Sequence, residues 1–174
     1  MEFRHYRLDD LDEVRPILSS IYATVHAGGG PFRTVERFEA RLASHTSGAD
    51  WHAVVARDGE TPAGFVYAAP LSPRTRWWEP MTEPLPEEYT RETGSRTLGL
   101  FELMLLPGYR GVGLARRLHD ELLGARTESR VSLLVAPAHD KVLALYENWG
   151  YRRVGDAQPF ADSPRFAVMV HARR

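Results

Sequence analysis

A glycine-rich turn in the stretch "LLPGYRGVGLARRL", residues 105–118, is the first feature of this sequence that could do chemistry. An apolar run ends at Pro107, and Gly108, Gly111 and Gly113 follow within six residues, directly before an amphipathic segment. Where such a turn leads into a helix, several backbone N–H groups have no intrahelical partner and can bind an anion. Glycine is also the ordinary residue of tight turns with positive φ, so the stretch is either an anion-binding loop or simply a close strand-to-helix connection.

Two common phosphate-binding motifs do not fit this turn. A dinucleotide-binding fingerprint needs G-x-G-x-x-G, but Gly111 and Gly113 are followed by Arg116 in the place of the third glycine. A Walker A loop needs a lysine after its last glycine, and the only lysine of the chain is Lys141. Both nucleotide-binding classes are therefore excluded for this stretch.

A carboxylate and a tyrosine stand out elsewhere in the sequence. Glu102 lies inside the apolar run "LFELMLL", where a carboxylate is costly unless it is paired, hydrated or functional. Tyr146 lies in "ALYENWGY", and its spacing from Val142 and Trp149 is that of one helix face. Tyr146 is therefore either a core aromatic or a functional hydroxyl.

Cysteine and histidine offer no further site. The chain has no cysteine, which excludes disulfides, thiolate metal ligands and a cysteinyl intermediate. The histidines are scattered without the spacing of metal ligands, so no metal is expected. His119, one turn along the segment after the glycine turn, is expected at the surface.

The segments "RGVGLA", residues 110–115, and "ALYENWGY", residues 144–151, resemble the two signatures of the GNAT superfamily of acyl-CoA-dependent N-acetyltransferases, R-x-x-G-x-[GA] and A-L-Y-x-x-x-G-[FY]. The signatures follow in family order, about thirty residues apart, and the resemblance covers nearly the whole chain except residues 70–96. It implies direct transfer of the acetyl group of acetyl-CoA, a cosubstrate, to a primary amine. The anion bound by the turn is then the pyrophosphate of coenzyme A.

The resemblance also implies which residues hold the cosubstrate. The loop binds the pyrophosphate chiefly through backbone amides, and the strand before it pairs with the pantetheine arm, with the Leu105 N–H facing the acyl carbonyl. His139 stands where many members carry an asparagine that contacts this arm; it either takes that role or only begins a helix with Asp140. The implied cofactor-binding residues are Leu105, Leu106, Arg110, Gly111, Val112, Gly113, Leu114, Ala115 and His139.

Two catalytic roles follow from the same resemblance. Tyr146 is the implied proton donor to the departing CoA thiolate, since a phenol of pKa about 10 can hydrogen-bond a thiolate. Glu102 is the implied general base or anchor for the incoming amine. Because the position of the strand acid varies among family members, a partly hydrated structural acid is the alternative for Glu102.

Alternating strand and helix patterns position these residues. Strands are predicted at 2–8, 51–57, 61–69, 97–106, 131–137 and 165–173, with a short extra strand at 151–154, and helices at 9–27, 34–44, 114–126 and 139–149. This order predicts a single α/β (α+β) domain over residues 1–174. The resemblance implies a mixed, mainly antiparallel sheet of six to seven strands, splayed at the strand before the glycine turn and flanked by about four helices.

The segment 70–96 is expected to select the amine, because it is long for a connection in a compact domain and carries aromatic residues among prolines. Between residues 79 and 92 it has five acids and one base, Arg91. An acidic, aromatic lid would attract a cationic amine, whereas the alternative is a solvated flap whose tryptophans cover the core or a partner in a homodimer. The candidate acceptor residues are Phe32, from the glycine-rich link after the first helix, and Trp77, Trp78 and Tyr89.

Composition excludes several other classes. A net charge of −1 without a basic stripe gives no nucleic-acid footprint, and no apolar run is long enough for a membrane span. The N-terminus "MEFRHYRLDD" lacks a signal-peptide profile, so a cytoplasmic location is expected. The sequence thus predicts an N-acetyltransferase acting on a small cationic amine. Acetylation of a protein N-terminus or lysine, and a CoA- or ligand-binding module without turnover, are the alternatives.

Overall fold

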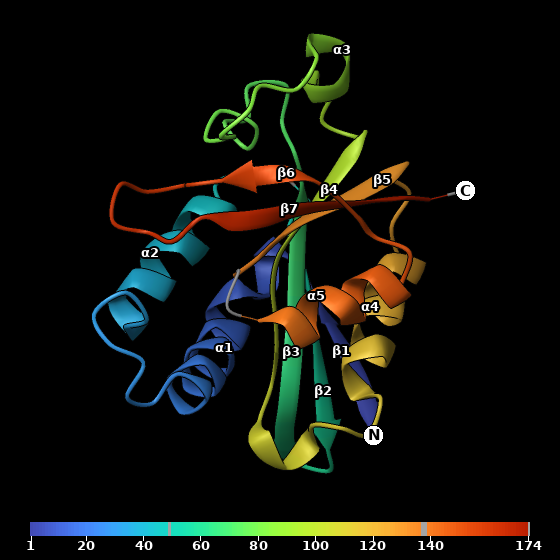
Figure 1. Cartoon of the computed structure of the whole chain (residues 1–174). Coiled ribbons are helices and arrows are strands. Elements are labelled where there is room, and N and C mark those ends of the chain that lie inside the picture. The colour runs from blue at the N-terminus through green and yellow to red at the C-terminus, as the bar shows by residue number, and fades with distance from the viewer. Residues whose placement is uncertain (49, 137–138, 174) are drawn as a thin grey trace. The chain divides into compact units, whose positions relative to one another are not determined.

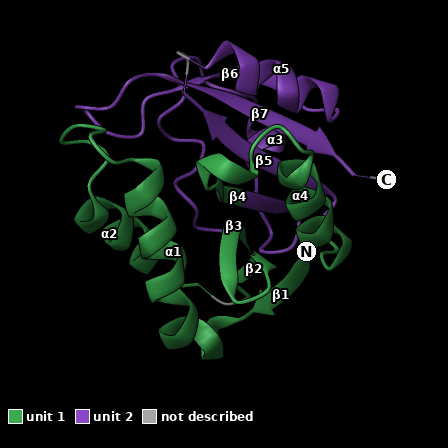
Figure 2. Ribbon diagram, turned by 90° about the horizontal axis from the view of Figure 1, so that it is seen from below, with its two compact units in different colours: residues 1–69, 100–127 green, residues 70–99, 128–174 purple. Residues whose placement is uncertain are grey.

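The computed structural model of the chain describes residues 1–48, 50–136 and 139–173 (Figure 1). It divides into two compact units, of which unit 1 comprises residues 1–69 and 100–127 and unit 2 comprises residues 70–99 and 128–174 (Figure 2). The strands are β1 (Glu2–Tyr6), β2 (His52–Asp58), β3 (Thr61–Pro70), β4 (Thr97–Leu105), β5 (Arg130–Val135), β6 (Arg152–Ala157) and β7 (Phe166–Ala172). The α-helices are α1 (Leu11–Val25), α2 (Val35–His45), α3 (Glu87–Thr90), α4 (Leu114–Gly124) and α5 (Asp140–Asn148).

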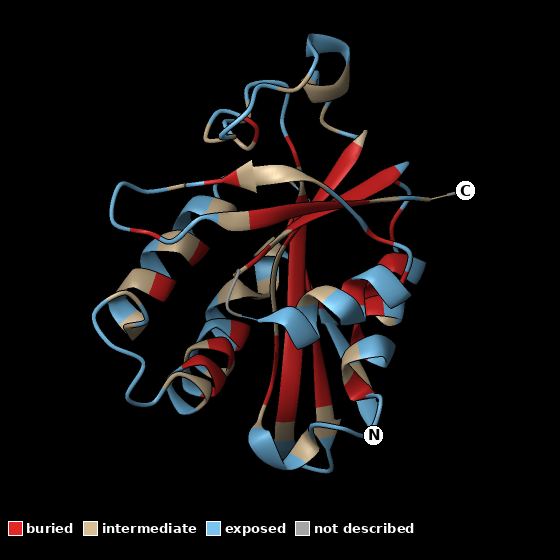
Figure 3. Ribbon diagram, in the orientation of Figure 1, coloured by how far each residue is buried: buried red, intermediate tan, exposed pale blue. Residues whose placement is uncertain are grey.

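The sheet of unit 1 is an antiparallel meander of β1, β2 and β3, in which β2 and β3 are joined by a tight turn. Strands β2 and β3 are buried along most of their length (Figure 3), because side chains on both of their faces are covered. This explains why their sequences are near-continuous apolar runs and not alternating ones. The end of β4 lies beside β3, where the Leu106 N–H donates to the Ala63 carbonyl at 2.9 Å.

Helices cover the two faces of this meander. The apolar stripe of α1, which includes Leu18 and Tyr22, packs with Phe38 of α2 in one core cluster that also holds Tyr6 of β1. His5, the neighbour of Tyr6, instead contacts Glu121 of α4 at 3.0 Å. Since successive side chains of a strand point to opposite faces, α4 lies on the face opposite α1 and α2.

Unit 2 begins with the segment 70–96, which contains the single helical turn α3. The first three residues of β4, Thr97–Gly99, pair in parallel with Arg130–Ser132 of β5. Strand β5 pairs antiparallel with β7, and β7 with β6. Helix α5 lies between β5 and β6 in the sequence and ends before Gly150, whose φ of +90° suits glycine.

The predicted fold class is confirmed as a mixed α/β fold with seven strands in the order β1-β2-β3-β4-β5-β7-β6 and mainly antiparallel pairing. The short strand expected at 151–154 is present as β6. The structure has the four helices expected and, in addition, the short helix α3, which the sequence did not predict. That the chain forms a single domain stays a prediction.

Candidate active site

The glycine turn joins β4 to α4 through a 3-10 turn at Pro107–Tyr109. Gly111 and Gly113 both have a φ of +78°, which L-residues rarely adopt, and a Cβ at either position would meet nothing within 4 Å. Val112 between them is 73% exposed. Gly113 is the N-cap of α4 and has no side-chain oxygen to satisfy the first amides of the helix. The turn thus offers exposed backbone donors at a helix N-terminus, a fit to an anionic phosphate.

The other residues implied for the loop contribute mainly backbone. The Leu114 side chain is 2% exposed and belongs to the core, so that only its amide can face a ligand. Ala115 is half-buried at the second position of α4. Nε of Arg110 donates to the Leu105 carbonyl at 3.2 Å, which draws the arginine back onto the strand. The Arg110 amide already donates to the Pro107 carbonyl at 3.3 Å, which leaves the terminal nitrogens of Arg110 for the implied phosphate contact.

The end of β4 is held close to β3. A Cβ on Gly64 would collide with Leu105 and the Met104 carbonyl, so only glycine permits this approach. The Leu106 N–H donates to the Ala63 carbonyl, and the Leu106 carbonyl accepts from the Tyr109 N–H at 3.0 Å. The Leu106 amide is thus already used in the pairing with β3, and contact of Leu106 with the cosubstrate stays a prediction. The role of the Leu105 N–H stays a prediction.

Glu102, three residues before Leu105 on the same strand, forms an ion pair with Arg41 of α2. Nη2 of Arg41 lies 3.3 Å from Oε1 of Glu102, and the two side chains are 23% and 16% exposed. Burial raises the pKa of Glu102 above its ordinary value, while the charge and hydrogen bond of Arg41 pull it back. Burial also opposes the charge on Arg41, but Glu102 and Tyr22 outweigh it and raise the pKa of Arg41. A carboxylate whose pKa is moved toward neutrality is suited to a general base.

Two tyrosines and a histidine surround this ion pair. Nη2 of Arg41 also donates to the Tyr22 hydroxyl at 3.3 Å, and Nδ1 of His45 lies 3.1 Å from the Tyr67 hydroxyl. Burial and the charge of Glu102 raise the pKa of Tyr67 well above 10, and burial and Arg41 lower the pKa of His45 to about 3. Tyr67 and His45 are therefore neutral at physiological pH. The sequence analysis identified neither Arg41 nor these three neighbours, although Arg41 and His45 are four residues apart on one helix face.

The strand alternation breaks beside Glu102. The Phe101 ring stacks on His45 with centroids 3.8 Å apart, and the next residue, Glu102, pairs with Arg41 of the same helix. Consecutive side chains of a regular strand face opposite ways, yet both of these neighbours contact side chains of α2. The ion pair with Arg41 explains how a carboxylate is accommodated in an apolar strand.

Tyr146 lies in unit 2, on α5, and is 8% exposed. Its ring makes edge-to-face contacts with Trp149 and Tyr151, at centroid distances of 5.2 and 5.3 Å. This packing matches the core-aromatic alternative and also fixes the direction of the phenol, so the proton-donor role stays a prediction. His139 is the exposed N-cap residue of α5 and makes no side-chain capping hydrogen bond. Its contact with the cosubstrate likewise stays a prediction.

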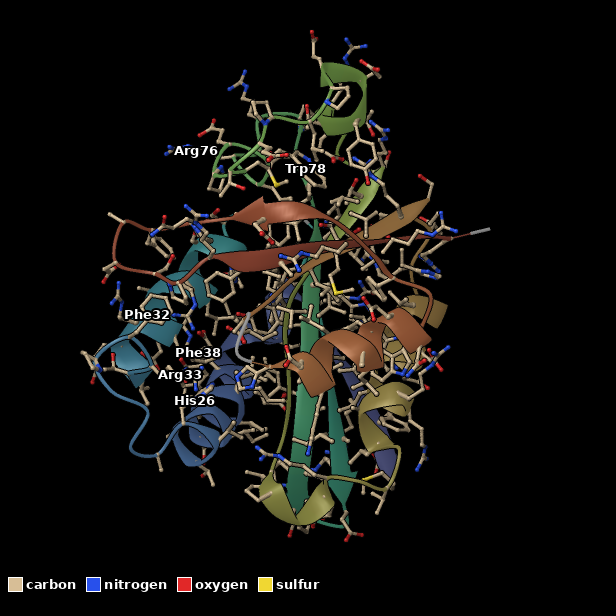
Figure 4. The ribbon with its side chains drawn as sticks, in the orientation of Figure 1. His26, Phe32, Arg33, Phe38, Arg76 and Trp78 are labelled. Atoms are coloured by element: carbon tan, nitrogen blue, oxygen red, sulfur yellow. The ribbon has the colours of Figure 1, made fainter. Side chains whose placement is uncertain are left out.

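Phe32, the candidate acceptor residue in unit 1, lies just before α2. Figure 4 labels it with Arg33 and Phe38 near the start of this helix and with His26 after the end of α1. The guanidinium of Arg37 lies 4.7 Å from the centre of the Phe32 ring. Phe32 thus packs against Arg37, whose carbonyl accepts from Nη1 of Arg41.

The candidate acceptor residues of unit 2 are engaged within that unit. Nε1 of Trp77 donates to the Ser132 hydroxyl at 2.9 Å. Trp78, labelled in Figure 4, is 8% exposed, and its ring and that of Tyr89 lie 5.2 and 4.7 Å from the guanidinium carbon of Arg130. For Trp78 this favours the alternative in which the aromatic residues of the segment cover the core. Contact of Trp77 and Tyr89 with an acceptor stays a prediction.

The acidic character of the segment 70–96 is weaker than the sequence indicates. Glu92 is buried and accepts hydrogen bonds at its Oε1 from Arg130, Thr97 and Trp78 at 2.8–3.0 Å. Two exposed acids also have arginine partners, since Glu79 pairs with Arg76 and Glu87 with Arg91. The expectation of five acids that face a cationic amine is therefore wrong for Glu92.

Two absences concern the described parts of the chain. Residues 1–48, 50–136 and 139–173 contain no group of three or more His, Cys, Asp or Glu side chains placed to hold a metal ion. Within the same ranges, no helix has both the length and the apolar character that crossing a membrane requires.

The comparisons with known proteins concern the family and the fold. Residues 12–151 match the family model described as "Acetyltransferase (GNAT) family". A putative GNAT acetyltransferase from Desulfovibrio desulfuricans is 14% identical, with a TM-score of 0.69 and 98% of each chain covered. A PaiA N-acetyltransferase from Thermoplasma acidophilum, solved with coenzyme A, is 13% identical, with a TM-score of 0.55 and 99% of each chain covered.

A third similar structure is the spermidine/spermine N-acetyltransferase of Vibrio cholerae in mutant forms, at 16% identity, a TM-score of 0.59, and 99% and 94% coverage of the two chains. At such identities these structures support the fold alone. No curated protein matches the sequence. Because the family model spans most of the chain and includes the glycine turn, Glu102 and Tyr146, the chain belongs to the acetyltransferase (GNAT) family.

Proposed function

We propose that the protein transfers the acetyl group of acetyl-CoA to a primary amine of a small molecule. The observation that carries the proposal is the arrangement on β4. A half-buried carboxylate with a raised pKa lies three residues before the strand end, and that strand runs into an exposed glycine turn suited to an anion. At about 3.3 Å per residue, Glu102 is roughly 10 Å along the strand from Leu105, within reach of an amine directly or through one water.

In this proposal Glu102 takes one proton from the incoming ammonium. The freed amine nitrogen then forms a bond to the acyl carbon, and the bond from that carbon to sulfur breaks. The nitrogen loses its second proton to solvent as the amide forms. The sulfur leaves as a thiolate that accepts the proton of Tyr146, which is restored from solvent, while Glu102 releases its proton. The sum is an acetylated amine, free coenzyme A and one proton.

The backbone supplies the remaining functions. The amides of Gly111 through Ala115 would hold the pyrophosphate, with the positive end of the α4 dipole beside it. The Leu105 N–H would donate to the acyl oxygen as negative charge develops on that oxygen. In other enzymes, loss of one such donor raises the activation free energy by roughly 3–4 kcal/mol.

The test is release of free thiol from acetyl-CoA across a panel of small primary amines, with thermal protection by acetyl-CoA measured in parallel. We expect both protection and amine-dependent release. Protection without turnover of any amine would point instead to a binding module, and turnover only with peptides would point to a protein acetyltransferase. No protection at all would remove the coenzyme A assignment.

A further inference from the structure

We infer that the amine accepted at Glu102 carries a carboxylate close to it, and that Arg41 recognises this carboxylate. The inference rests on the proposed acetyl transfer and names its substrate class, an amino acid or a similar zwitterion. Arg41 thereby becomes a specificity-determining residue of the reaction, beside the carboxylate that serves as base.

Arg41 has donors to spare. Among the described residues it makes three hydrogen bonds, to the Arg37 carbonyl, the Tyr22 hydroxyl and Glu102, each 3.3 Å long and each from a terminal nitrogen. A guanidinium has five N–H donors in a rigid fork that matches a carboxylate in a bidentate manner. The single long contact with Glu102 does not use that fork. With 23% of its side chain exposed, Arg41 can receive a carboxylate from solvent.

The local charge balance favours a zwitterion. Arg41 and Glu102 compensate each other, and the low pKa of His45 keeps that neighbour neutral. A plain amine that paired with Glu102 would leave the half-buried guanidinium without its counterion, which is costly. A zwitterion replaces the Arg41–Glu102 pair by two new ion pairs instead, because its ammonium group pairs with Glu102 and its carboxylate pairs with Arg41. When Glu102 accepts the proton and becomes neutral, the substrate carboxylate still balances the charge of Arg41, which would otherwise have no counterion.

The same surface disfavours a polycation. Arg37 and Arg41 lie four residues apart on one face of α2, and Arg33 lies two residues before the start of this helix (Figure 4). A polyamine would bring further positive charges beside these arginines. The acids of the segment 70–96 that suggested a cationic acceptor are partly paired with arginines of their own. Charge complementarity therefore selects a neutral zwitterion over spermidine-like amines.

The experiment uses matched acceptors: α-amino acids, their carboxamides, the corresponding decarboxylated amines, and spermidine. For the wild-type protein we expect kcat/KM for the best amino acid to exceed that of its carboxamide by about 10- to 100-fold, the worth of a charge-assisted hydrogen bond. In Arg41→Gln this ratio should fall to near one, chiefly through a higher KM for the acid. Titration calorimetry of the amino acid onto the protein saturated with coenzyme A should show the same loss without any turnover.

Controls separate this inference from the proposed function. Arg4→Gln removes an exposed arginine of the same unit, which forms an ion pair with Glu2 at the surface, and should leave the ratio unchanged. Equal turnover of amino acids and their carboxamides by the wild-type protein would overturn the inference but leave acetyl transfer standing. An equal fall in kcat/KM for both kinds of acceptor in Arg41→Gln would have the same meaning. Binding of acetyl-CoA without turnover of any amine overturns both. If Arg41→Gln fails to fold, the wild-type ratio and Arg41→Lys, which keeps the charge but loses the fork, decide the question.

Discussion

Arg41 and Glu102 are 61 residues apart in the sequence, yet their side chains meet at 3.3 Å in a largely covered part of unit 1. Burial pushes the pKa of Glu102 upward and Arg41 pushes it downward. The pair therefore sets the pH at which this carboxylate can accept a proton, and α2 acts on the chemistry of β4 through it.

The first prediction concerns this pH dependence. Glu102 is competent as a base only when ionised, so kcat/KM should fall as pH falls through its raised pKa. Arg41→Gln removes the cation that opposes the rise, so the acid limb of the pH profile should move to higher pH. Glu102→Gln should lower kcat by about 10²- to 10⁴-fold and abolish that limb.

The matched control for this prediction is Glu39→Gln, because Glu39 is an exposed carboxylate on the same helix as Arg41 and accepts a hydrogen bond from the Ser19 hydroxyl. Its profile should coincide with that of the wild-type protein. An acid limb in Arg41→Gln that stays at the wild-type pH would show that Glu102 is not the group titrating.

The second prediction tests the glycine turn as the coenzyme A site. Gly113→Ala places a side chain at a φ of +78°, which costs roughly 1–2 kcal/mol for an L-residue, and should distort the amides that begin α4. We expect coenzyme A to bind at least several-fold more weakly by titration calorimetry. Gly108→Ala is the matched control, since Gly108 has no positive φ and a Cβ there would meet nothing within 4 Å. Equal affinities in the two variants would argue against the turn as the binding loop.

The third prediction separates the two roles open to Tyr146. If its hydroxyl protonates the thiolate, Tyr146→Phe should lower kcat by one order of magnitude or more while the Kd for coenzyme A changes little, because the ring that packs on Trp149 is kept. Tyr151→Phe removes a hydroxyl from the neighbouring ring and serves as the control. A normal kcat in Tyr146→Phe would leave Tyr146 as a core aromatic.

Local patterns were enough to predict the elements and the conformation of the turn. Alternation and apolar runs place the strands within a few residues, and the positive φ of Gly111 and Gly113 follows from glycine in a tight strand-to-helix connection. Glu102 also stood out, because a carboxylate in an apolar strand needs an explanation. These predictions depend on neighbours in the sequence only.

What could not be predicted depends on tertiary contacts. Neither Arg41 as the partner of Glu102 nor Arg130 as the partner of Glu92 follows from a local pattern, since these pairs are 61 and 38 residues apart. The expectation that His119 is exposed is wrong, as it is 2% exposed. His119 lies one turn after Ala115 and one turn before Leu122, so it falls on the covered face of α4, which is wider than its leucine stripe.

The last prediction concerns the buried network that holds the segment 70–96. Nε of Arg130 donates to Thr97 at 2.6 Å and its Nη2 to Glu92 at 2.8 Å, with the Arg130 and Glu92 side chains 8% and 0% exposed. Arg130→Met leaves Glu92 as an uncompensated buried charge and should lower the free energy of unfolding by about 3–5 kcal/mol in urea titrations. Arg76→Ala breaks an exposed pair in the same segment and should cost no more than about 1 kcal/mol. Because the network ties this segment to β5, Arg130→Met should also speed proteolytic cleavage within residues 70–96. Equal stability and equal cleavage rates in Arg130→Met and Arg76→Ala would show that the network does not anchor the segment.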